Sequence, residues 1–351
     1  MTSYKEAIDF EHLYESAMKC KRNVLWKNSV SNFMLNVSKK VEELSVSLNN
    51  GTYVSKQPTR FKVYTPKERD ILSVPYMDRV YQRSLNDNIL YPVMVKSFIY
   101  DNCACQRGKG TDFARGRIKE HLHRFYRKYG TDGYVLQIDI KKYYDSMSHK
   151  LVEEMFKKKI DPETYNAVEN ILENQYAGDR GFSAGSQLIQ IAGISFLNGI
   201  DHYIKEQLHI KGYVRYMDDL ILIHHSKEYL EECWKILDTK LAEIELKIHP
   251  KKTNIHKVTD NTPFLGFNYR LTNTGKVLML MRKSYIKRQK RHLKGLVRAY
   301  GKGRMTKEKL ENCYMCLKDH TRKGNTYYYL QKLDKLYRQE VKKCQSFLEL
   351  K

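Results

Sequence analysis

The sequence predicts an α+β fold in which helices cover one face of a small β-sheet. From residue 134 onward, the expected elements follow the order strand, helix, hairpin, helix, strand. Small α+β domains are built from such an order. Apolar residues at helical spacing dominate both ends of the chain. The predicted sheet therefore lies in the middle of a largely helical sequence.

The composition indicates a folded, basic protein. The chain has 351 residues, of which 41% are hydrophobic, and its formal net charge is +23. This length is enough for two domains or one multi-part enzyme, and the charge is typical of a protein that holds a polyanion. The alternative is a basic surface without a partner. No run of 18 uncharged apolar residues exists, so no membrane-spanning segment is expected, and residues 1–10 lack the apolar core of a secretory signal.

The first third of the chain alternates helical and irregular segments. We expect helices over residues 4–49, ended by Asn49-Asn50-Gly51, and again over residues 77–97. Residues 53–75 contain three prolines and are predicted to be extended. A polar loop with glycines follows at residues 101–112, and a basic helix comes after it.

The central third carries carboxylates where strands end or turn. Residues 134–140 alternate like a strand with Asp139 near its end. Residues 213–224 are expected to form a strand, a turn containing Asp218-Asp219, and a second strand. The other predicted elements here are a helix from Ser186 to about Leu208, a helix capped by Ser226 that continues to Ile244, and a short strand at Phe264-Leu265-Gly266-Phe267.

The last part of the chain is strongly basic. The stretch from Lys276 to Arg304 holds eleven Lys or Arg residues and no Asp or Glu. Two further helices are expected, around residues 310–317 and 330–348, and they could be an ordinary helical cap or an oligomerisation stripe. An acid-free basic helix indicates a polyanion along one face. The residues predicted to share that face are Lys287, Arg288, Arg291 and Lys294.

Three aspartates form a candidate metal site. Phosphoryl transfer by two Mg²⁺ ions needs converging carboxylates, and adjacent strands bring a strand end (Asp139) and a turn (Asp218, Asp219) to one edge of a sheet. Two aspartates in a turn are, on their own, more often a solvated hairpin tip. Here largely apolar strands flank the turn, and two like charges beside them are costly without cations. We therefore expect two Mg²⁺ ions, with Mn²⁺ as an alternative.

An ordered set of segments resembles the motifs of reverse transcriptases. Tyr216-Met217-Asp218-Asp219 is similar to their Tyr-x-Asp-Asp motif, and residues 139–145, Asp-Ile-Lys-Lys-Tyr-Tyr-Asp, resemble their first catalytic motif. The order and spacing match over roughly residues 50–270. The other matching segments are the glycine-rich residues 181–187, Lys252-Thr253 after residues 246–248, the primer-grip residues 264–267, and the fingers segments at residues 66–71 and 78–82.

Within the family, residues 104–111 and Gly185-Ser186-Gln187 most resemble stand-alone bacterial and prophage enzymes. These include diversity-generating retroelement enzymes and unassigned groups linked to phage defence. The resemblance implies an RNA-directed DNA polymerase that uses an RNA template and dNTPs and makes DNA. It also implies a right-hand fold. Its expected parts are a helical N-terminal extension (residues 1–49), fingers (50–133), a ferredoxin-like palm (134–270) and a basic helical thumb (271–351).

The resemblance also implies roles for individual residues. Asp139 and Asp218 would be direct metal ligands, Asp219 a supporting one, and the backbone carbonyl of Ile140 would complete the set. Tyr144 would lie under the incoming sugar and exclude a 2′-hydroxyl, its alternative being a core tyrosine. The remaining implied roles are Arg69 and Lys67 on the triphosphate, Gly185 beside the nascent pair, Gln187 on the template base or nucleotide, and Lys252 as proton donor to pyrophosphate.

The sequence departs from the family pattern in the glycine-rich motif. Ala184 stands where bacterial members usually have Gln, and the usual prolines are absent, which bears on fidelity and template choice. No ribonuclease H or endonuclease motif is recognisable, which favours a dedicated structured RNA partner; an oligomer or an accessory protein stays open. Two rival functions also stay open: a template-independent or protein-primed polymerase, and an inactive nucleic-acid-binding subunit of a defence complex. Seven scattered cysteines fit a reduced cytoplasm.

Overall fold

The computed structural model describes residues 2–64, 68–183 and 185–349, with side chains up to residue 344. These residues belong to two compact units, which are described separately below. The first unit comprises residues 1–114, 138–221 and 231–254, and the second comprises residues 115–137, 222–230 and 255–351.

These units do not follow the predicted boundaries between extension, fingers, palm and thumb, and the four-part division stays a prediction. Within the described ranges, no helix is both long and apolar enough to cross a membrane.

The first unit begins with helices, as expected for residues 4–49. Ser3 starts them with a capping box: its Oγ accepts the Glu6 amide at 3.2 Å, and the Ser3 amide donates to the Glu6 carboxylate at 2.7 Å. Asp9 caps the second helix by accepting the His12 amide. The bounds are α1 Tyr4–Ala7, α2 Phe10–Cys20, α3 Asn28–Leu35 and α4 Val37–Asn49.

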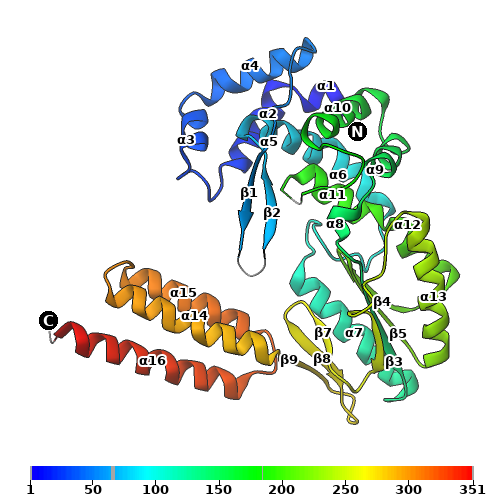
Figure 1. The fold of residues 1–351 in the computed structure, drawn as a ribbon, viewed down its shortest axis with the longest axis vertical. Coiled ribbons are helices and arrows are strands. Elements are labelled where there is room, and N and C mark those ends of the chain that lie inside the picture. Colours follow the sequence, from blue (N-terminus) through cyan, green and yellow to red (C-terminus); the bar gives the residue numbers. More distant parts are fainter. Residues whose placement is uncertain (1, 65–67, 184, 350–351) are drawn as a thin grey trace. The chain divides into compact units, whose positions relative to one another are not determined.

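A β-hairpin and a long helical segment follow. Strands β1 (Thr59–Val63) and β2 (Arg69–Ser73) pair antiparallel (Figure 1). The helix predicted over residues 77–97 is confirmed, but a π-helical segment interrupts it, a feature that is frequent at functional sites. Its parts are α5 Tyr76–Leu85, η1 Asn86–Leu90, α6 Tyr91–Met94 and η2 Val95–Ser97.

A four-stranded sheet carries the predicted carboxylates. Its strand order is β4-β5-β3-β6, so the end of β3 lies beside the start of β5. Consecutive residues of β3 and β5 are buried, so both faces of these strands are covered, whereas the sequence predicts helices on one face only. The bounds are β3 Tyr134–Asp139, β4 Gly212–Tyr216, β5 Asp219–His224 and β6 Asn254–Lys257.

The helices between these strands begin at the predicted caps. Ser186, the predicted start of one helix, accepts the Ile189 amide with its Oγ at 3.2 Å, and Ser226 Oγ accepts the Tyr229 amide at 3.0 Å, as its N-cap prediction requires. The helical character of residues 186–208 is confirmed, in three pieces. The bounds are α8 Tyr143–Ser146, α9 His149–Lys157, α10 Pro162–Gln175, α11 Gln187–Phe196, α12 Asn198–His202, η3 Tyr203–Gln207 and α13 Lys227–Glu243.

The second unit contains most of the basic helix α7 (Thr111–Tyr129) and a three-stranded sheet. The prediction of a strand at Phe264–Phe267 is wrong. Leu265 and Gly266 form a two-residue turn with φ of +44° and +88°, and Phe264 pairs with Phe267 across it. A turn with positive φ at both central positions is the usual tight connection of a hairpin. The strands are β7 Thr262–Phe264, β8 Phe267–Leu271 and β9 Val277–Met281.

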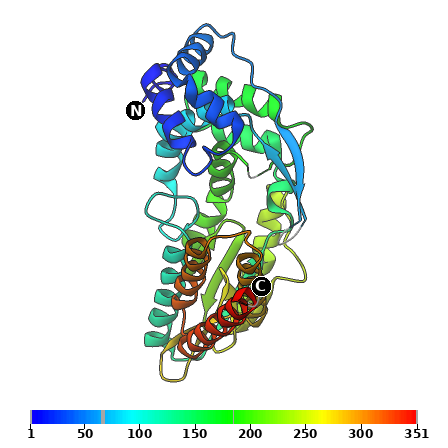
Figure 2. The ribbon, with the colours of Figure 1, turned by 90° about the vertical axis from the view of Figure 1, so that its left-hand side faces the viewer.

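Helices α14 (Lys283–Gly301), α15 (Lys307–Arg322) and α16 (Tyr327–Glu349) lie side by side in the second unit (Figure 2). They confirm the helices expected in the basic C-terminal part. The core between them is formed by Leu293, Tyr314 and Leu333. The rings of Tyr314 and Tyr337 stack with centroids 3.9 Å apart.

Candidate active site

Two of the three predicted carboxylates interact where β3 ends. Burial, and then the negative charge of Asp139, raise the pKa of the Asp218 carboxyl above its ordinary value. Asp218 lies in the β4–β5 turn, but Asp219 is already the first residue of β5 and not a turn residue. Among the described residues, no three or more His, Cys, Asp or Glu side chains gather closely enough to hold a metal ion. The structure therefore brings Asp139 and Asp218 together without completing a three-carboxylate group.

Lys252 lies directly against the first of these carboxylates. Its Nζ is 2.8 Å from Asp139 Oδ1 and 3.0 Å from Oδ2. The backbone around Asp139 is fixed by the same segment, because its amide donates to Thr253 Oγ1 and its carbonyl accepts the His249 amide. The Lys252 ammonium group therefore neutralises the Asp139 carboxylate in this structure.

The backbone carbonyl of Ile140 is the fourth predicted ligand. Ile140 is buried and forms an antiparallel bridge with Ile248. The bridge is made by the Lys141 amide, which donates to the Lys247 carbonyl at 2.8 Å, and by the His249 amide on the Asp139 carbonyl. These two hydrogen bonds do not use the Ile140 carbonyl. That oxygen can therefore bind a cation without breaking the bridge.

A buried ion pair lies next to the β4–β5 turn. Arg215 on β4 and Asp201 on α12 are both 0% exposed. Arg215 Nε and Nη2 are 2.7 and 2.5 Å from the two Asp201 oxygens, and Tyr213 donates its hydroxyl to Asp201 Oδ1 at 2.7 Å. Burial alone would lower the pKa of Arg215, but the charge and hydrogen bonds of Asp201 raise it above its ordinary value. The arginine is therefore held charged inside the protein.

The same guanidinium holds the turn itself. Arg215 Nη1 donates to the Met217 carbonyl at 3.1 Å, and Nη2 donates to the Ile194 carbonyl at 2.9 Å. Met217 has φ of +56°, a left-handed conformation that is uncommon for a residue with a side chain. The hydrogen bond from the buried Arg215 stabilises this strained conformation, and it thereby orients the next residue, Asp218.

Tyr144 lies in a restricted space beside α11. It belongs to α8, and its hydroxyl is buried without a hydrogen-bond partner in the described structure. A Cβ added at Gly193 would come within 2.6 Å of that hydroxyl, and Tyr143 donates its own hydroxyl to the Gly193 carbonyl at 2.5 Å. Burial raises the pKa of the Tyr144 hydroxyl, so it stays neutral. Gly193 thus makes room for a ring that offers an unused polar group.

The glycine-rich segment contacts the β1–β2 hairpin. A Cβ added at Gly185 would lie 2.5 Å from the Leu72 carbonyl, so only glycine fits this approach. Ser183 Oγ accepts the Leu72 amide at 3.1 Å. Gln187 is the first residue of α11, and Arg69 is an exposed residue at the start of β2. Lys67 and Ala184, both singled out from the sequence, lie outside the described residues.

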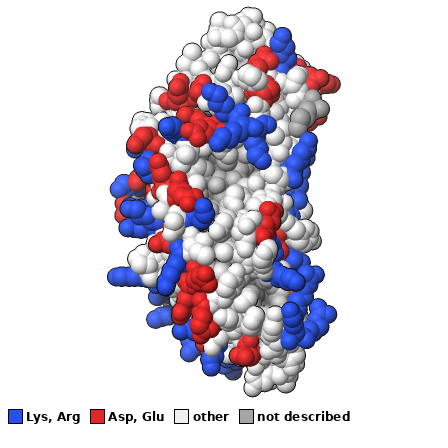
Figure 3. All heavy atoms as spheres, turned by 90° about the vertical axis from the view of Figure 1, so that its right-hand side faces the viewer, with Lys and Arg blue, Asp and Glu red and all other residues white. Residues whose placement is uncertain are grey.

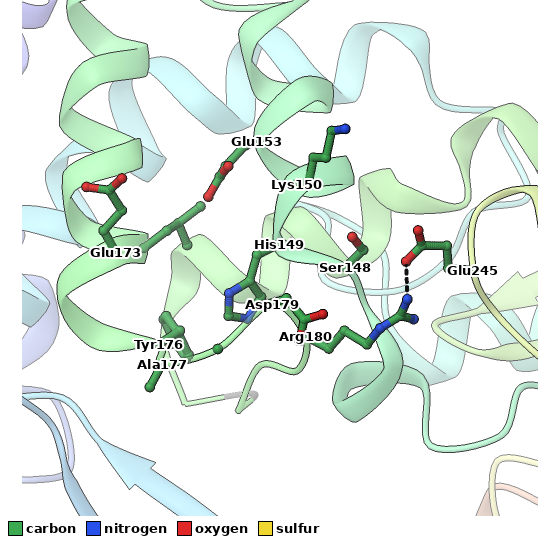
Figure 4. A pocket seen from close by; sticks show the side chains of 12 residues that line it. Ser148, His149, Lys150, Glu153, Glu173, Tyr176, Ala177, Asp179, Arg180 and Glu245 are labelled. Carbon is green, nitrogen blue, oxygen red and sulfur yellow. Dashed lines mark ion pairs between the residues drawn. The ribbon is translucent and has the colours of Figure 1, made fainter.

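A separate cavity of about 540 Å³ contains none of the predicted site residues (Figure 4). Both signs of charge line it, and Arg180 pairs with Glu245 at 2.7 Å. His149 Nε2 donates to the Gly181 carbonyl at 2.8 Å, and its ring lies against Phe182. The His149 contacts hold the start of the glycine-rich segment, which gives the cavity wall a structural role.

Comparison with known families decides the assignment. The family model described as "Reverse transcriptase (RNA-dependent DNA polymerase)" matches residues 56–269. The chain belongs to the reverse transcriptase family. The match covers the paired carboxylates, the β4–β5 turn and Lys252, and it confirms the resemblance inferred from the motifs and the α+β right-hand polymerase fold. No curated protein matches the sequence.

Solved structures similar to this reverse transcriptase include yeast telomerases. Apo telomerase of Candida tropicalis, truncated from its C-terminal domain, is 15% identical with a TM-score of 0.48, over 64% of this chain and 55% of that chain. Telomerase of Candida albicans in complex with a TWJ fragment of telomeric RNA is 12% identical with a TM-score of 0.48, over 83% and 55%. The chain spans about half the length of these telomerase chains.

The basic residues predicted on one helix face are not equivalent in the reverse transcriptase. Lys287, Arg288 and Arg291 on α14 are exposed, but Lys294 Nζ is 3.5 Å from a Glu340 oxygen. The basic stretch itself holds no acid, but Glu340 of α16 supplies one beside Lys294. On the face drawn in Figure 3, Lys and Arg are interspersed with Asp and Glu. Positively charged residues therefore do not form a continuous patch on that face.

Sequence reasoning missed Arg215 and Asp201. The signal was present: Arg215 stands inside a strand whose neighbours are buried on both faces, next to the Tyr-x-Asp-Asp motif. Arginine is almost never fully buried unless it is paired. A search for an acid on a preceding helix could have found Asp201.

Removing one partner of this pair should destabilise the enzyme. We predict that Asp201→Asn lowers the free energy of unfolding by about 3–5 kcal/mol, because it leaves a buried guanidinium charge uncompensated. Urea denaturation measures the change. Asp238→Asn, at an exposed site on α13, is the matched control and should stay within about 0.5 kcal/mol.

The double variant Asp201→Leu/Arg215→Met separates stability from positioning. It should recover much of the stability, because apolar replacement of a buried pair is often neutral. Nucleotide incorporation should stay low, because the Met217 carbonyl has lost its donor. Full activity in the double variant would show that the turn does not depend on Arg215.

Proposed function

We propose that this chain synthesises DNA on an RNA template by adding dNTPs to a primer 3′-hydroxyl. The observation that carries the proposal is the Asp139–Asp218 pair at the adjoining ends of β3 and the β4–β5 turn, within a matched reverse transcriptase region. The proposed ligands of two Mg²⁺ ions, or Mn²⁺, are Asp139, Asp218, Asp219 and the Ile140 carbonyl. Two such ions supply charge neutralisation at the attacking and leaving oxygens.

The residues present fit divalent cations in two respects. All the proposed donors are hard oxygens, which Mg²⁺ prefers. Burial is the main cause of the raised pKa of Asp218 and the negative charge of Asp139 adds to it, and Lys252 already places a positive charge against Asp139. Bringing Asp219 into the set is the further step that ion binding requires.

The chain's own groups then have separate roles. Asp139 and Asp218 orient the reacting oxygens, and Arg215 keeps Asp218 in place through the Met217 carbonyl. Lys252, held at the same edge, donates a proton to the leaving pyrophosphate. Arg69, with Lys67, contacts the triphosphate, Gln187 contacts the template base or nucleotide, and the Tyr144 ring lies under the sugar. Gly185 lets the backbone approach the new pair.

The biological setting is proposed from the sequence motifs. We place the chain among stand-alone bacterial or prophage enzymes, in the cytoplasm, with a dedicated non-coding RNA and a role in phage defence or a retroelement. The seven free cysteines support a reducing compartment. An accessory protein or a second copy remains compatible with this setting. An incorporation assay on primed RNA, with and without template, separates the proposal from template-independent synthesis, protein priming and a binding-only subunit.

Asp218→Asn should abolish nucleotide incorporation and leave RNA binding nearly unchanged. It removes a ligand that stabilises charge in the transition state, not a phosphate contact made elsewhere. Primer extension and filter binding measure the two properties, with Asp238→Asn as the matched control. Retention of more than a few per cent of wild-type extension would refute the role of Asp218, and Asp139→Asn should behave in the same way.

Replacing Tyr144 with Ala should admit ribonucleotides. The half-buried ring, which packs against Gly193, is proposed to fill the space that a 2′-hydroxyl needs. The readout is the ratio of rNTP to dNTP incorporation on one template, which should rise at least tenfold, or about 1.4 kcal/mol. Tyr144→Phe keeps the ring and is the control. An unchanged ratio in an active Ala variant would make Tyr144 a core residue.

Changing Lys287, Arg288 and Arg291 together to Gln should weaken binding of a primer–template duplex. These three side chains are exposed on α14, whereas Lys294 is paired with Glu340. The slope of log affinity against log salt should fall by about two to three units, about 0.9 per lost contact. Lys294→Gln alone should change the slope by less than half a unit. Wild-type affinity and slope in the triple variant would mean that this face is only solvated.

A further inference from the structure

A small cavity in the first unit is lined by side-chain amides from three separate segments. It has a volume of about 280 Å³. Asn86 comes from the π-helical segment η1, Gln106 from the loop before α7, and Gln187 and Gln190 from the first turn of α11. Amides that converge from distant parts of the sequence are suited to recognise a ligand with hydrogen-bonding edges.

Two of these amides have unused acceptors. Asn86 Oδ1 and Gln187 Oε1 are buried and have no hydrogen-bond partner among the described residues. Asn86 is 8% exposed, so solvent does not satisfy it, and such orphaned groups in folded proteins call for an explanation. The terminal torsion of a side-chain amide is soft, so a small rotation presents either oxygen to a ligand.

Two of the amide donors of the cavity, those of Asn86 and Gln106, are already engaged. Asn86 Nδ2 donates to Asp87 Oδ1 at 3.2 Å, and Arg83 neutralises Asp87 at 2.7 Å. Gln106 Nε2 donates to the Asn102 carbonyl at 2.6 Å. The two buried atoms of the cavity that lack a partner, Asn86 Oδ1 and Gln187 Oε1, are both carbonyl oxygens, so a ligand that satisfies them must bring N–H donors.

A flat, positively charged platform adjoins the amides. The Arg107 guanidinium lies 4.9 Å from the centre of the Tyr91 ring, and the Arg107 amide donates to the Tyr91 hydroxyl at 2.6 Å. Both residues line the cavity. Single-stranded RNA is commonly bound by stacking bases on aromatic rings or guanidinium planes and by hydrogen bonds to their edges. The charge of Arg107 also suits the neighbouring phosphate.

The cavity is adjacent to the proposed sugar position. Cys105 lines it and is near enough to Tyr144 to contribute, after burial, to the raised pKa of that hydroxyl. The Asp218 carboxylate contributes to the same shift. A base held in the cavity therefore lies in the neighbourhood of the reacting groups.

We propose that this cavity binds an unpaired RNA base carrying an exocyclic amino group, with Asn86 and Gln187 as acceptors and Arg107 on Tyr91 as the stacking platform. Adenine, cytosine and guanine bring an amino group with two N–H donors, whereas uracil has only its single ring N–H. The proposal rests on the proposed function, since it assigns a binding site for the template strand of that reaction.

The test compares 12-nucleotide RNAs of adenylate, cytidylate and uridylate by fluorescence anisotropy, without dNTPs or divalent cations. Wild-type protein should bind the first two about fivefold more tightly than the third, the size expected of one hydrogen bond. Asn86→Leu should reduce this ratio to below twofold. Asn86→Asp, which keeps acceptor oxygens, should preserve the ratio even if all affinities fall.

Asn88→Leu is the matched control, because Asn88 is in the same π-helical segment, bonds to the Ser84 carbonyl and does not line the cavity. It should keep the wild-type ratio. Equal binding of all three RNAs by wild-type protein, or a ratio that Asn86→Leu leaves unchanged, would overturn the proposal. If wild-type protein extends primers but shows no base preference, only the cavity assignment fails. If it shows the preference but extends no primer, the proposed polymerase function fails and the cavity assignment stands.

Discussion

The buried ion pair between Arg215 and Asp201 is the constraint on which the candidate active site depends. β4 is buried on both faces, so a charge within it must be neutralised inside the protein. Asp201 does this from α12, and the remaining donor of Arg215 reaches the Met217 carbonyl. Because desolvation offsets much of the attraction in such a pair, we infer that it specifies the geometry of the turn more than it adds stability.

That geometry imposes an electrostatic problem. Fixing Asp218 beside Asp139 brings two carboxylates into a partly buried site, where burial, and then the charge of Asp139, raise the pKa of Asp218. Lys252 relieves it on one side only, by pairing with Asp139. The same negative charge would repel the backbone of the proposed RNA template, which is why we propose that basic side chains elsewhere, such as the exposed residues of α14, hold it while cations screen the carboxylates.

Local signals let the sequence predict much of this arrangement. Ser186 and Ser226 cap helices as expected, and alternation placed Asp139 near the end of β3 and Asp218 in a hairpin turn. Contacts between distant residues were not predictable in the same way. The Lys294–Glu340 pair and the Arg215–Asp201 pair depend on packing between elements, and apolar spacing does not report which charges meet. The Leu265-Gly266 turn was mistaken for strand because its flanking phenylalanines have strand-like composition.

Polar atoms without partners give a second, independent indication of where ligands bind. One such atom means little by itself, since Ser16 Oγ is also unpartnered, within α2. Tyr144, Gln187 and Asn86 differ because they are linked by a single neighbourhood: Gln187 and Asn86 line the same cavity, and Cys105 in that cavity influences Tyr144. A folded chain tolerates several buried, unsatisfied groups in one place when a ligand satisfies them together, because the cost in the free protein is recovered on binding. The Arg215–Asp201 ion pair thus makes the proposed catalytic edge rigid before any ligand binds. The unpaired amides near it belong to a cavity whose hydrogen bonds, in our proposal, are completed by its ligand.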